Sequence, residues 1–347
     1  MLLEIFFNRL ALKKQTGSRF KNVPKQEIPL LSQSTIKKIY VLLNEALKKA
    51  VSWDMLPKNP LNFQVASGKA NVRPSWDTET LQEALKDMEG NTEHPILRLM
   101  VHTTFICSGR SSEMTALTWD SIDFKNDTIF INKIIQRCEK TSMEKVRKDK
   151  IFLVFPEKYP NKRKKSVLVL KSPKTETSVR NIFMTQQLKQ ELLERKKQIE
   201  RAKIILGDDY HDYNLVFCLD NGDPITPNLC LRWFKKWQKS MGDKYPEVVF
   251  HSLRSTSTTY KLVMSNGDIK TVQGDTGHAQ AKMVTDVYSR IWNKPRQQLA
   301  QKVETEFYQA FENTQQCNSA QEKENLKDLL ENDSVKKLLE AALSLVQ

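Results

Sequence analysis

A polar, turn-rich segment at residues 65–76, VASGKANVRPSW, divides the chain into a short first part and a long second part. Its glycine, proline and short polar side chains favour turns and interrupt helices and strands. A chain of 347 residues is long enough for two domains. We therefore expect a small domain before this segment and a larger one after it, each with its own hydrophobic core.

The first part is predicted to be helical. Within residues 33–53, apolar side chains recur at intervals of three and four, at Ile36, Tyr40, Leu43, Ala46 and Leu47. This spacing places them on one face of an amphipathic helix, with lysines around it. Pro57 and Pro60 end the helical pattern.

The second part is predicted to combine helices with short strands. Asp77 is a favourable first cap for a helix at 77–89, and an apolar run at 95–107 indicates a buried helix. More helices are expected at 185–205, at 226–241 and, as short elements, between 252 and 313. Strands are expected at 128–135, 151–155, 166–170, 179–183 and the LVFCL segment at 215–219. The predicted fold class is α+β, mainly helical, with a small antiparallel sheet.

The charge of the chain favours a polyanionic partner. Fifty-five lysines and arginines against 41 acidic residues give a formal net charge of +14, and nucleic acid is the usual partner of such a protein. Apolar runs are too short to cross a bilayer, so we expect a cytoplasmic protein, nucleoid-associated when bound to DNA, without a membrane partner. The five cysteines lack disulfide or metal-site spacing, so neither a disulfide framework nor a structural metal is expected.

Two further segments each allow two interpretations. The charged stretch at 137–165 is either a solvated insertion between strands or a basic hairpin that touches the DNA backbone. Residues 314–347 contain an apolar stripe, from Leu326 to Val346, that needs a surface to cover it. The stripe can pack on its own domain or on a neighbouring protomer.

The candidate catalytic residues are two arginines, a lysine, two histidines and a tyrosine, in the order Arg110, Lys174, His251, Arg254, His278, Tyr288. Guanidinium groups suit the non-bridging oxygens of a phosphodiester. A tyrosine hydroxyl, with an ordinary pKa of about 10, must lose its proton to attack, and histidine can accept that proton. Lysine can protonate a departing 5′ oxygen. Because these side chains supply the positive charge, no metal or other cofactor is expected.

The order and spacing of these residues resemble the tyrosine recombinase (phage integrase) family, including integrases of prophages and conjugative transposons. The H-S-L-R stretch at 251–254, followed by G-H and then Tyr288, is similar to the C-terminal signature of that family. The pattern R-x-x-E-M-x-x-L-x-W-x-x-I-D starts at Arg110, and K-T-x-x-S-x-R starts at Lys174. The resemblance covers roughly residues 33 to 300.

The resemblance implies a role for each residue. Arg110 and Arg254 would clamp the scissile phosphate, and Lys174 would be the general acid for the leaving 5′ hydroxyl. His251 would assist proton transfer at the tyrosine, and His278 would hydrogen-bond to the phosphate. Tyr288 would form a 3′-phosphotyrosyl link, with Glu113 in support. The basic side chains that we expect on the DNA backbone are Lys37, Lys48, Arg163, Lys164 and Arg180.

The resemblance also implies an organisation and partners. Residues 1–70 would be a helical core-binding domain, truncated at its N-terminus, and 71–313 the mixed α/β catalytic domain of the tyrosine recombinase type. Residues 314–347 would be a tail that docks on a neighbouring protomer. The enzyme would act as a homo-tetramer on double-stranded attachment sites, integrating or excising a mobile element. An excisionase or a host DNA-bending protein would be the accessory partner.

The sequence departs from the family pattern at the first arginine. The family usually has T-G-L-R, whereas this chain has Cys107-Ser108-Gly109-Arg110, so the glycine is displaced by one place. Two other functions remain open at this stage. One is relaxation of DNA in the manner of a type IB topoisomerase, and the other is a non-catalytic DNA-binding relic.

Overall fold

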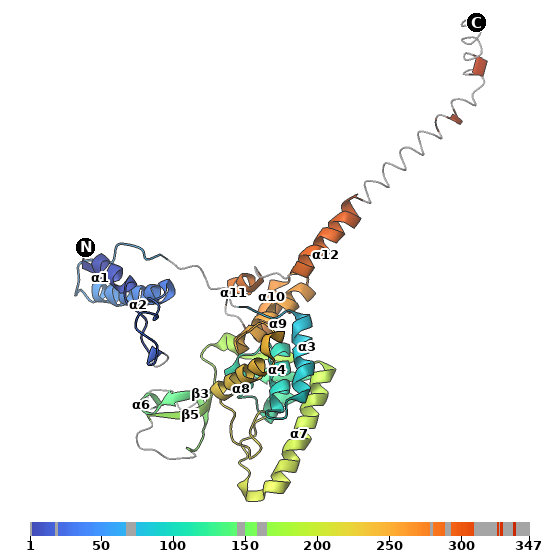
Figure 1. The fold of residues 1–347 in the computed structure, drawn as a ribbon, viewed down its shortest axis with the longest axis horizontal. Coiled ribbons are helices and arrows are strands. Elements are labelled where there is room, and N and C mark those ends of the chain that lie inside the picture. Colours follow the sequence, from blue (N-terminus) through green and yellow to red (C-terminus); the bar gives the residue numbers. More distant parts are fainter. Residues whose placement is uncertain are drawn as a thin grey trace. The chain divides into compact units, whose positions relative to one another are not determined.

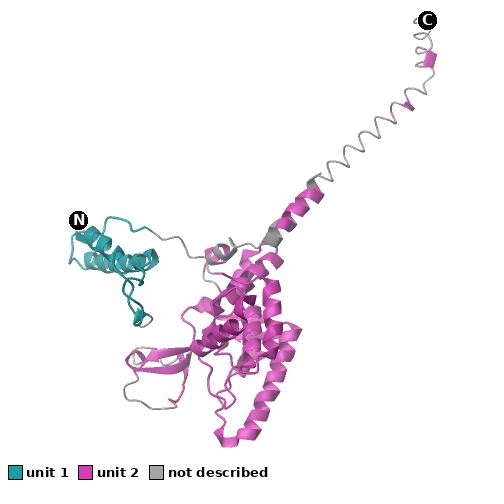
Figure 2. Cartoon of the chain, viewed as in Figure 1, with its two compact units in different colours: residues 1–73 teal, residues 74–347 magenta. Residues whose placement is uncertain are grey.

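The computed structural model describes residues 2–17, 20–66, 74–143, 150–157, 165–277, 280–288 and 293–308, and the single residues 325, 327, 328, 336 and 337. The chain folds into two compact units, residues 1–73 and 74–347 (Figure 2). The first unit begins and ends close to the predicted helical domain 1–70.

The first unit is built on two helices, α1 (Leu2–Ala11) and α2 (Gln33–Ser52). The Ser32 side chain accepts a hydrogen bond from the backbone N–H of Thr35 and caps α2. The small core of the unit consists of the buried residues Phe7, Leu10, Ile36 and Leu61. Ile36 lies on the predicted apolar face, so the amphipathic pattern of α2 is confirmed.

The second unit is centred on the buried helix α4 (Ile96–Ile106), as the apolar run at 95–107 predicted. Other helices surround it: α3 (Thr78–Asp87), α5 (Ser111–Met114), α7 (Gln186–Leu206), α8 (Pro227–Ser240) and α9 (Phe250–Met264) (Figure 1). Asp77 caps α3 by accepting from Thr80 N–H at 2.8 Å. Trp76 packs against the rings of Phe234 and Tyr245 in the main core. The helical majority of the predicted fold class is therefore confirmed.

In the part of the chain that the structure describes, the strands form two antiparallel sheets of three strands each, where one small sheet was predicted. The first has the order β1 (Ile122–Asp123), β2 (Thr128–Ile131), β6 (Arg180–Phe183). The second has the order β3 (Ile134–Glu139), β5 (Ser166–Lys171), β4 (Ile151–Val154). The helix α6 (Lys140–Met143) follows β3.

Two strand predictions were wrong in detail. The single strand predicted at 128–135 is divided at residues 132 and 133, because β2 and β3 pair in different sheets. The LVFCL segment forms isolated bridges, Thr118 with Leu215 and Cys218 with Pro224, instead of a regular strand. Leu215, Val216, Phe217 and Cys218 are buried in succession. A run of buried residues without alternation does not by itself indicate a strand.

The C-terminal helices follow the predicted pattern of short elements. They are α10 (Ile269–Thr276), α11 (Ala281–Tyr288) and α12 (Asn293–Val303), followed by a π-helical turn (Glu304–Tyr308). Leu262 of α9 packs with Val272 and Val284, which joins α9, α10 and α11. Single-turn 3-10 helices occupy Met88–Gly90, Trp119–Ser121, Glu176–Ser178, Gly207–Asp209 and Gly242–Lys244. Within the described ranges, no helix is both long and apolar enough to cross a membrane.

Candidate active site

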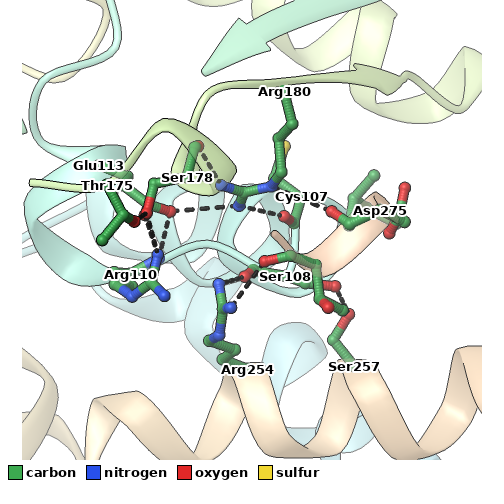
Figure 3. Close-up of polar contacts among 12 residues, drawn as sticks. Cys107, Ser108, Arg110, Glu113, Thr175, Ser178, Arg180, Arg254, Ser257 and Asp275 are labelled. Atoms are coloured by element: carbon green, nitrogen blue, oxygen red, sulfur yellow. Dashed lines mark hydrogen bonds and ion pairs between the residues drawn. The ribbon is translucent and has the colours of Figure 1, made fainter. Parts of the chain in front are cut away.

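Four segments of the second unit meet around three arginine side chains (Figure 3). They are the turn after α4, the loop between β5 and β6, the start of α9 and the end of α10. Buried hydroxyls on α9 fix its position: Ser252 donates to Pro74 O at 2.8 Å, and Thr256 donates to Trp76 O at 2.8 Å. These bonds hold the H-S-L-R segment of α9 against the chain that precedes α3.

Arg110 is held by Glu113 and by the β5–β6 loop. Its Nη1 donates to Glu113 Oε1 at 2.5 Å and lies 3.4 Å from Ser178 Oγ, while its backbone N–H donates to Glu113 Oε2 at 3.0 Å. Burial by itself would raise the pKa of the Glu113 carboxyl. The guanidinium groups of Arg180 and Arg110 outweigh burial, so this pKa is below its ordinary value and Glu113 is an anion. The predicted supporting role of Glu113 fits this geometry.

Arg254 is a buried cation whose described partners are backbone carbonyls. The residue is 2% exposed, and it donates to Ser108 O at 2.5 Å and to Thr276 O at 2.6 Å. Burial, followed by the nearby charge of Arg110, lowers the pKa of Arg254 to about 9. Among the described residues, Arg254 forms no ion pair with a carboxylate. A buried cation in this state is stabilised by an anion that binds beside it.

The turn before Arg110 accounts for the departure from the family's T-G-L-R pattern. Ser108 has a left-handed backbone with φ of 46°. Its N–H donates to Phe105 O at 3.2 Å, and the N–H of Gly109 donates to Thr104 O at 3.0 Å. These two bonds form a Schellman motif that ends α4. Ser108 thus occupies the left-handed position, which aims its carbonyl at Arg254.

Buried hydrogen bonds hold Ser108 in this unfavourable conformation. Its Oγ lies 2.7 Å from Ser257 Oγ and accepts from Lys261 Nζ at 3.1 Å. Lys261 also donates to Ile106 O at 2.5 Å and forms an ion pair with Asp275. The hydrogen bonds of the serine side chain therefore offset part of the free-energy cost of the left-handed backbone conformation, a cost that glycine would avoid.

We expect Ser108→Gly to be more stable than Ser108→Ala, although glycine is the smaller residue. Both variants lose the hydrogen bonds of Oγ, but alanine keeps the left-handed strain. The expected difference in the free energy of unfolding is about 1 kcal/mol. Chemical denaturation of both variants measures it. An alanine variant as stable as the glycine variant would contradict the strained turn.

The remaining predicted catalytic residues are described to different extents. Lys174 is exposed on the β5–β6 loop, and His251 is exposed on the first turn of α9. Tyr288 is the last residue of α11, and its backbone alone is described. His278 lies outside the described residues, directly after Gly277, which ends α10. The structure thus brings together Arg110, Glu113 and Arg254, and it places Lys174 on the loop that contacts Arg110 through Ser178.

The predicted DNA-backbone residues fall into three groups. Lys37 and Lys48 are exposed on α2, and Lys48 pairs with Glu45 at 2.8 Å. Arg163 and Lys164 lie outside the described residues. Arg180 is buried beneath the site, and its side chain is 4% exposed. Burial of this extent does not favour the DNA contact predicted for Arg180, since its guanidinium is already bonded to protein oxygens.

The sequence reasoning missed the supporting roles of Ser108, Arg180, Lys261 and Asp275. A signal for Arg180 was present in the alternation of β6, where Arg180 and Ile182 point inward while Asn181 and Phe183 are exposed. Ile182 is an evident core residue, so the period of two in a strand places Arg180 on the same buried face. No comparable pattern in the sequence indicates the supporting roles of Lys261 and Asp275.

The family profile described as Phage integrase family matches residues 75–294, more than half of the chain. A search of curated proteins found no match. One similar solved structure is the Tn1549 transposon integrase in complex with transposon right end DNA, with 20% identity and a TM-score of 0.59, covering 79% of this chain and 80% of that one. Another is a Tn1549 integrase in complex with a circular intermediate DNA, with 18% identity and a TM-score of 0.58, covering 87% of this chain and 92% of that one. The structural likeness shows a shared fold, and the profile shows the family. The chain belongs to the phage integrase family and is a tyrosine-type site-specific DNA recombinase.

Proposed function

We propose that the protein integrates or excises a mobile element by cutting and rejoining double-stranded DNA through a 3′-phosphotyrosyl intermediate on Tyr288. The single observation that carries this proposal is the buried Arg254 beside Arg110, a cation that forms no ion pair among the described residues and that a bound anion would stabilise. A phosphodiester is such an anion, and DNA, the substrate of a recombinase, contains it.

The charge of the site suits the transition state better than the ground state. The charged groups that these hydrogen bonds and ion pairs join are four cations and two carboxylates, which leaves a surplus of two positive charges before the exposed Lys174 is added: Arg110, Arg180, Arg254, Lys261, Glu113 and Asp275. A phosphodiester carries one negative charge, and attack by a phenolate brings the reacting group to two. Fixed positive charge therefore stabilises the developing dianion more than the bound substrate, which is the condition for catalysis.

Each bond change has a candidate residue in the proposed reaction. The Tyr288 oxygen bonds to phosphorus as the bond from phosphorus to the 5′ oxygen breaks. His251 accepts the phenol proton, Lys174 donates a proton to the departing 5′ oxygen, and His278 donates to the phosphate. The reverse attack by a 5′ hydroxyl rejoins the strand and frees Tyr288. The phosphotyrosyl ester retains the bond energy, so rejoining requires no ATP.

A plasmid assay distinguishes recombination from topoisomerase-like relaxation. We expect the protein to recombine two DNA molecules that carry the end sequences of its element, and not plasmids that lack them. Relaxation of plasmids irrespective of sequence would instead support the type IB topoisomerase alternative. Binding without any covalent adduct would support the non-catalytic relic.

DNA contacts outside the active site are proposed on both units. Lys37 and Lys48 are exposed on α2, where they can reach phosphates. Exposed basic residues lie on the sheet of β3, β5 and β4 and beside its strands: Arg137 is in β3, Lys140 begins α6 and Lys150 directly precedes β4. We extend the proposal of backbone contact to this sheet and to Arg163 and Lys164 in its connecting segment. The alternative is a solvated sheet that makes no DNA contact. Replacing these basic residues by neutral ones separates the two, because only a sheet that contacts DNA would then show a weaker dependence of DNA affinity on salt.

We also propose that the protein acts as a homo-tetramer in the cytoplasm, with an excisionase or a host DNA-bending protein as accessory partner. Residues 314–347 lie almost entirely outside the described residues, and their apolar stripe supports docking on a neighbouring protomer.

Deleting residues 319–347 is expected to impair assembly of the tetramer on DNA. Analytical ultracentrifugation of the protein–DNA complex measures the loss. Leu338→Ser with Leu339→Ser should reproduce the effect, whereas Lys336→Ser with Lys337→Ser is the matched control at the two preceding positions. Unchanged sedimentation of the truncated complex would contradict docking by the tail.

A further inference from the structure

Arg180 lies at a junction of four segments and is bonded to each of them (Figure 3). Its Nε donates to Asp275 O at 3.0 Å, and its Nη1 donates to Ser178 O at 3.0 Å. Its Nη2 donates to Cys107 O at 3.1 Å and to Glu113 Oε2 at 3.1 Å. One planar guanidinium therefore ties the end of α10, the β5–β6 loop, the end of α4 and the helix α5.

Each of these attachment points is a few residues from a predicted catalytic residue. Cys107 precedes Arg110 by three residues, and Glu113 pairs with Arg110. Ser178 closes the loop that carries Lys174, and Asp275 precedes His278 by three residues. We propose that Arg180 is a positioning residue that sets the β5–β6 loop and the end of α10 in register with Arg110. This inference rests on the proposed function, because it assigns Arg180 a part in that reaction.

The backbone of Gly277 shows how closely the segments approach at this junction. Gly277 ends α10 with a left-handed φ of 65°. A Cβ atom built on it would lie 2.8 Å from Thr177 O and 3.0 Å from Arg180 Cδ. The β5–β6 loop and the end of α10 are thus in contact across the Arg180 side chain, so a shift of one displaces the other.

The bonding pattern requires arginine rather than a positive charge alone. The guanidinium presents donors on three nitrogens in fixed directions, and here they reach oxygens in four segments. Lysine would keep the charge beside Glu113 but presents its donors from a single nitrogen. Arg180→Lys therefore keeps the positive charge of the site, but it no longer fixes the position of the β5–β6 loop relative to the end of α10.

The test compares Arg180→Lys with Arg195→Lys. Arg195 is the matched control, because its Nε donates to Val216 O at 3.2 Å and its Nη2 donates to Cys218 O at 3.0 Å, away from the catalytic segments. Both variants should melt at a lower temperature than the wild type. For Arg180→Lys, we expect single-turnover cleavage to fall about 100-fold with little loss of DNA affinity, as a misplaced catalytic group would cause. Cleavage by Arg195→Lys should stay near the wild-type rate.

A modified substrate separates positioning from simple loss of structure. When sulfur replaces the bridging 5′ oxygen, the strand departs as a thiolate and needs no proton from Lys174. If Arg180 positions the Lys174 loop, the deficit of Arg180→Lys should shrink at least tenfold on this substrate. An equal deficit on both substrates, or wild-type cleavage of ordinary DNA, would overturn the proposal. If the wild type itself forms no adduct, the proposed function fails, whatever Arg180 does.

Gly277→Ala tests the same junction if Arg180→Lys fails to fold. Its control is Gly242→Ala, because Gly242 also has a left-handed φ of 60° but has nothing within 4 Å of an added Cβ. Both variants carry the backbone strain, and Gly277→Ala alone pushes the loops apart. We expect slow cleavage and rescue by the sulfur substrate for Gly277→Ala alone. Equal behaviour of the two variants would overturn the proposal.

Discussion

Replacing Tyr288 by phenylalanine is expected to abolish covalent attachment to DNA and to leave DNA binding nearly unchanged. The substitution removes the phenolic oxygen and nothing else, so the shape of α11 and the charge of the site stay as they are. Removal of the nucleophile in a well-studied hydrolase costs about 10⁶-fold in rate. A loss of that size would bring the adduct below detection.

A nicked duplex measures this effect, because the short strand released by cleavage diffuses away and traps the protein on DNA. Tyr260→Phe is the matched control. Tyr260 lies on α9 with its ring 5.7 Å from that of Phe105, outside the group of arginines. The control should form the adduct at the wild-type rate. A trapped adduct with Tyr288→Phe would show that another residue is the nucleophile.

The grouping of Arg110, Glu113 and Arg254 could be predicted from motif order, because each motif preserves the local spacing that its chemistry needs. The three-residue interval from Arg110 to Glu113 places both on α5 and its cap, where they pair. Arg254 could be predicted from the H-S-L-R stretch, which begins α9. The pattern of apolar residues likewise predicted α2, α4, α7 and α8 to within a few residues.

The supporting contacts could not be predicted in this way, because they join residues that are distant in the sequence. Arg180, the last residue of the K-T-x-x-S-x-R motif, was expected on the DNA backbone, yet its bonding partners span Cys107 to Asp275. The displaced glycine of the T-G-L-R region did not show which residue would take the left-handed position. Ser108 occupies it because Ser257 and Lys261, from another helix, hold its side chain. Tertiary contacts thus outweighed local propensity at both positions.

Replacing Arg254 by glutamine is expected to slow cleavage about 1000-fold, the loss that follows removal of one donor to a developing anion. Glutamine keeps a side chain of similar reach and can still donate to Ser108 O or Thr276 O, but it removes the buried charge. DNA affinity should fall much less, because many exposed basic residues share the contact with the backbone. Single-turnover cleavage and equilibrium binding measure the two effects separately.

A substrate with a neutral methylphosphonate at the cleavage position tests whether charge is the cause. Its transition state carries one negative charge less, so the charge of Arg254 contributes less to its stabilisation. The deficit of Arg254→Gln should therefore be much smaller on the methylphosphonate than on ordinary DNA. Tyr288→Phe, which lacks the nucleophile, should stay inactive on both substrates. If the deficit of Arg254→Gln appeared as weaker binding alone, or were the same on both substrates, Arg254 would be a structural or binding residue and not the group that stabilises the transition state.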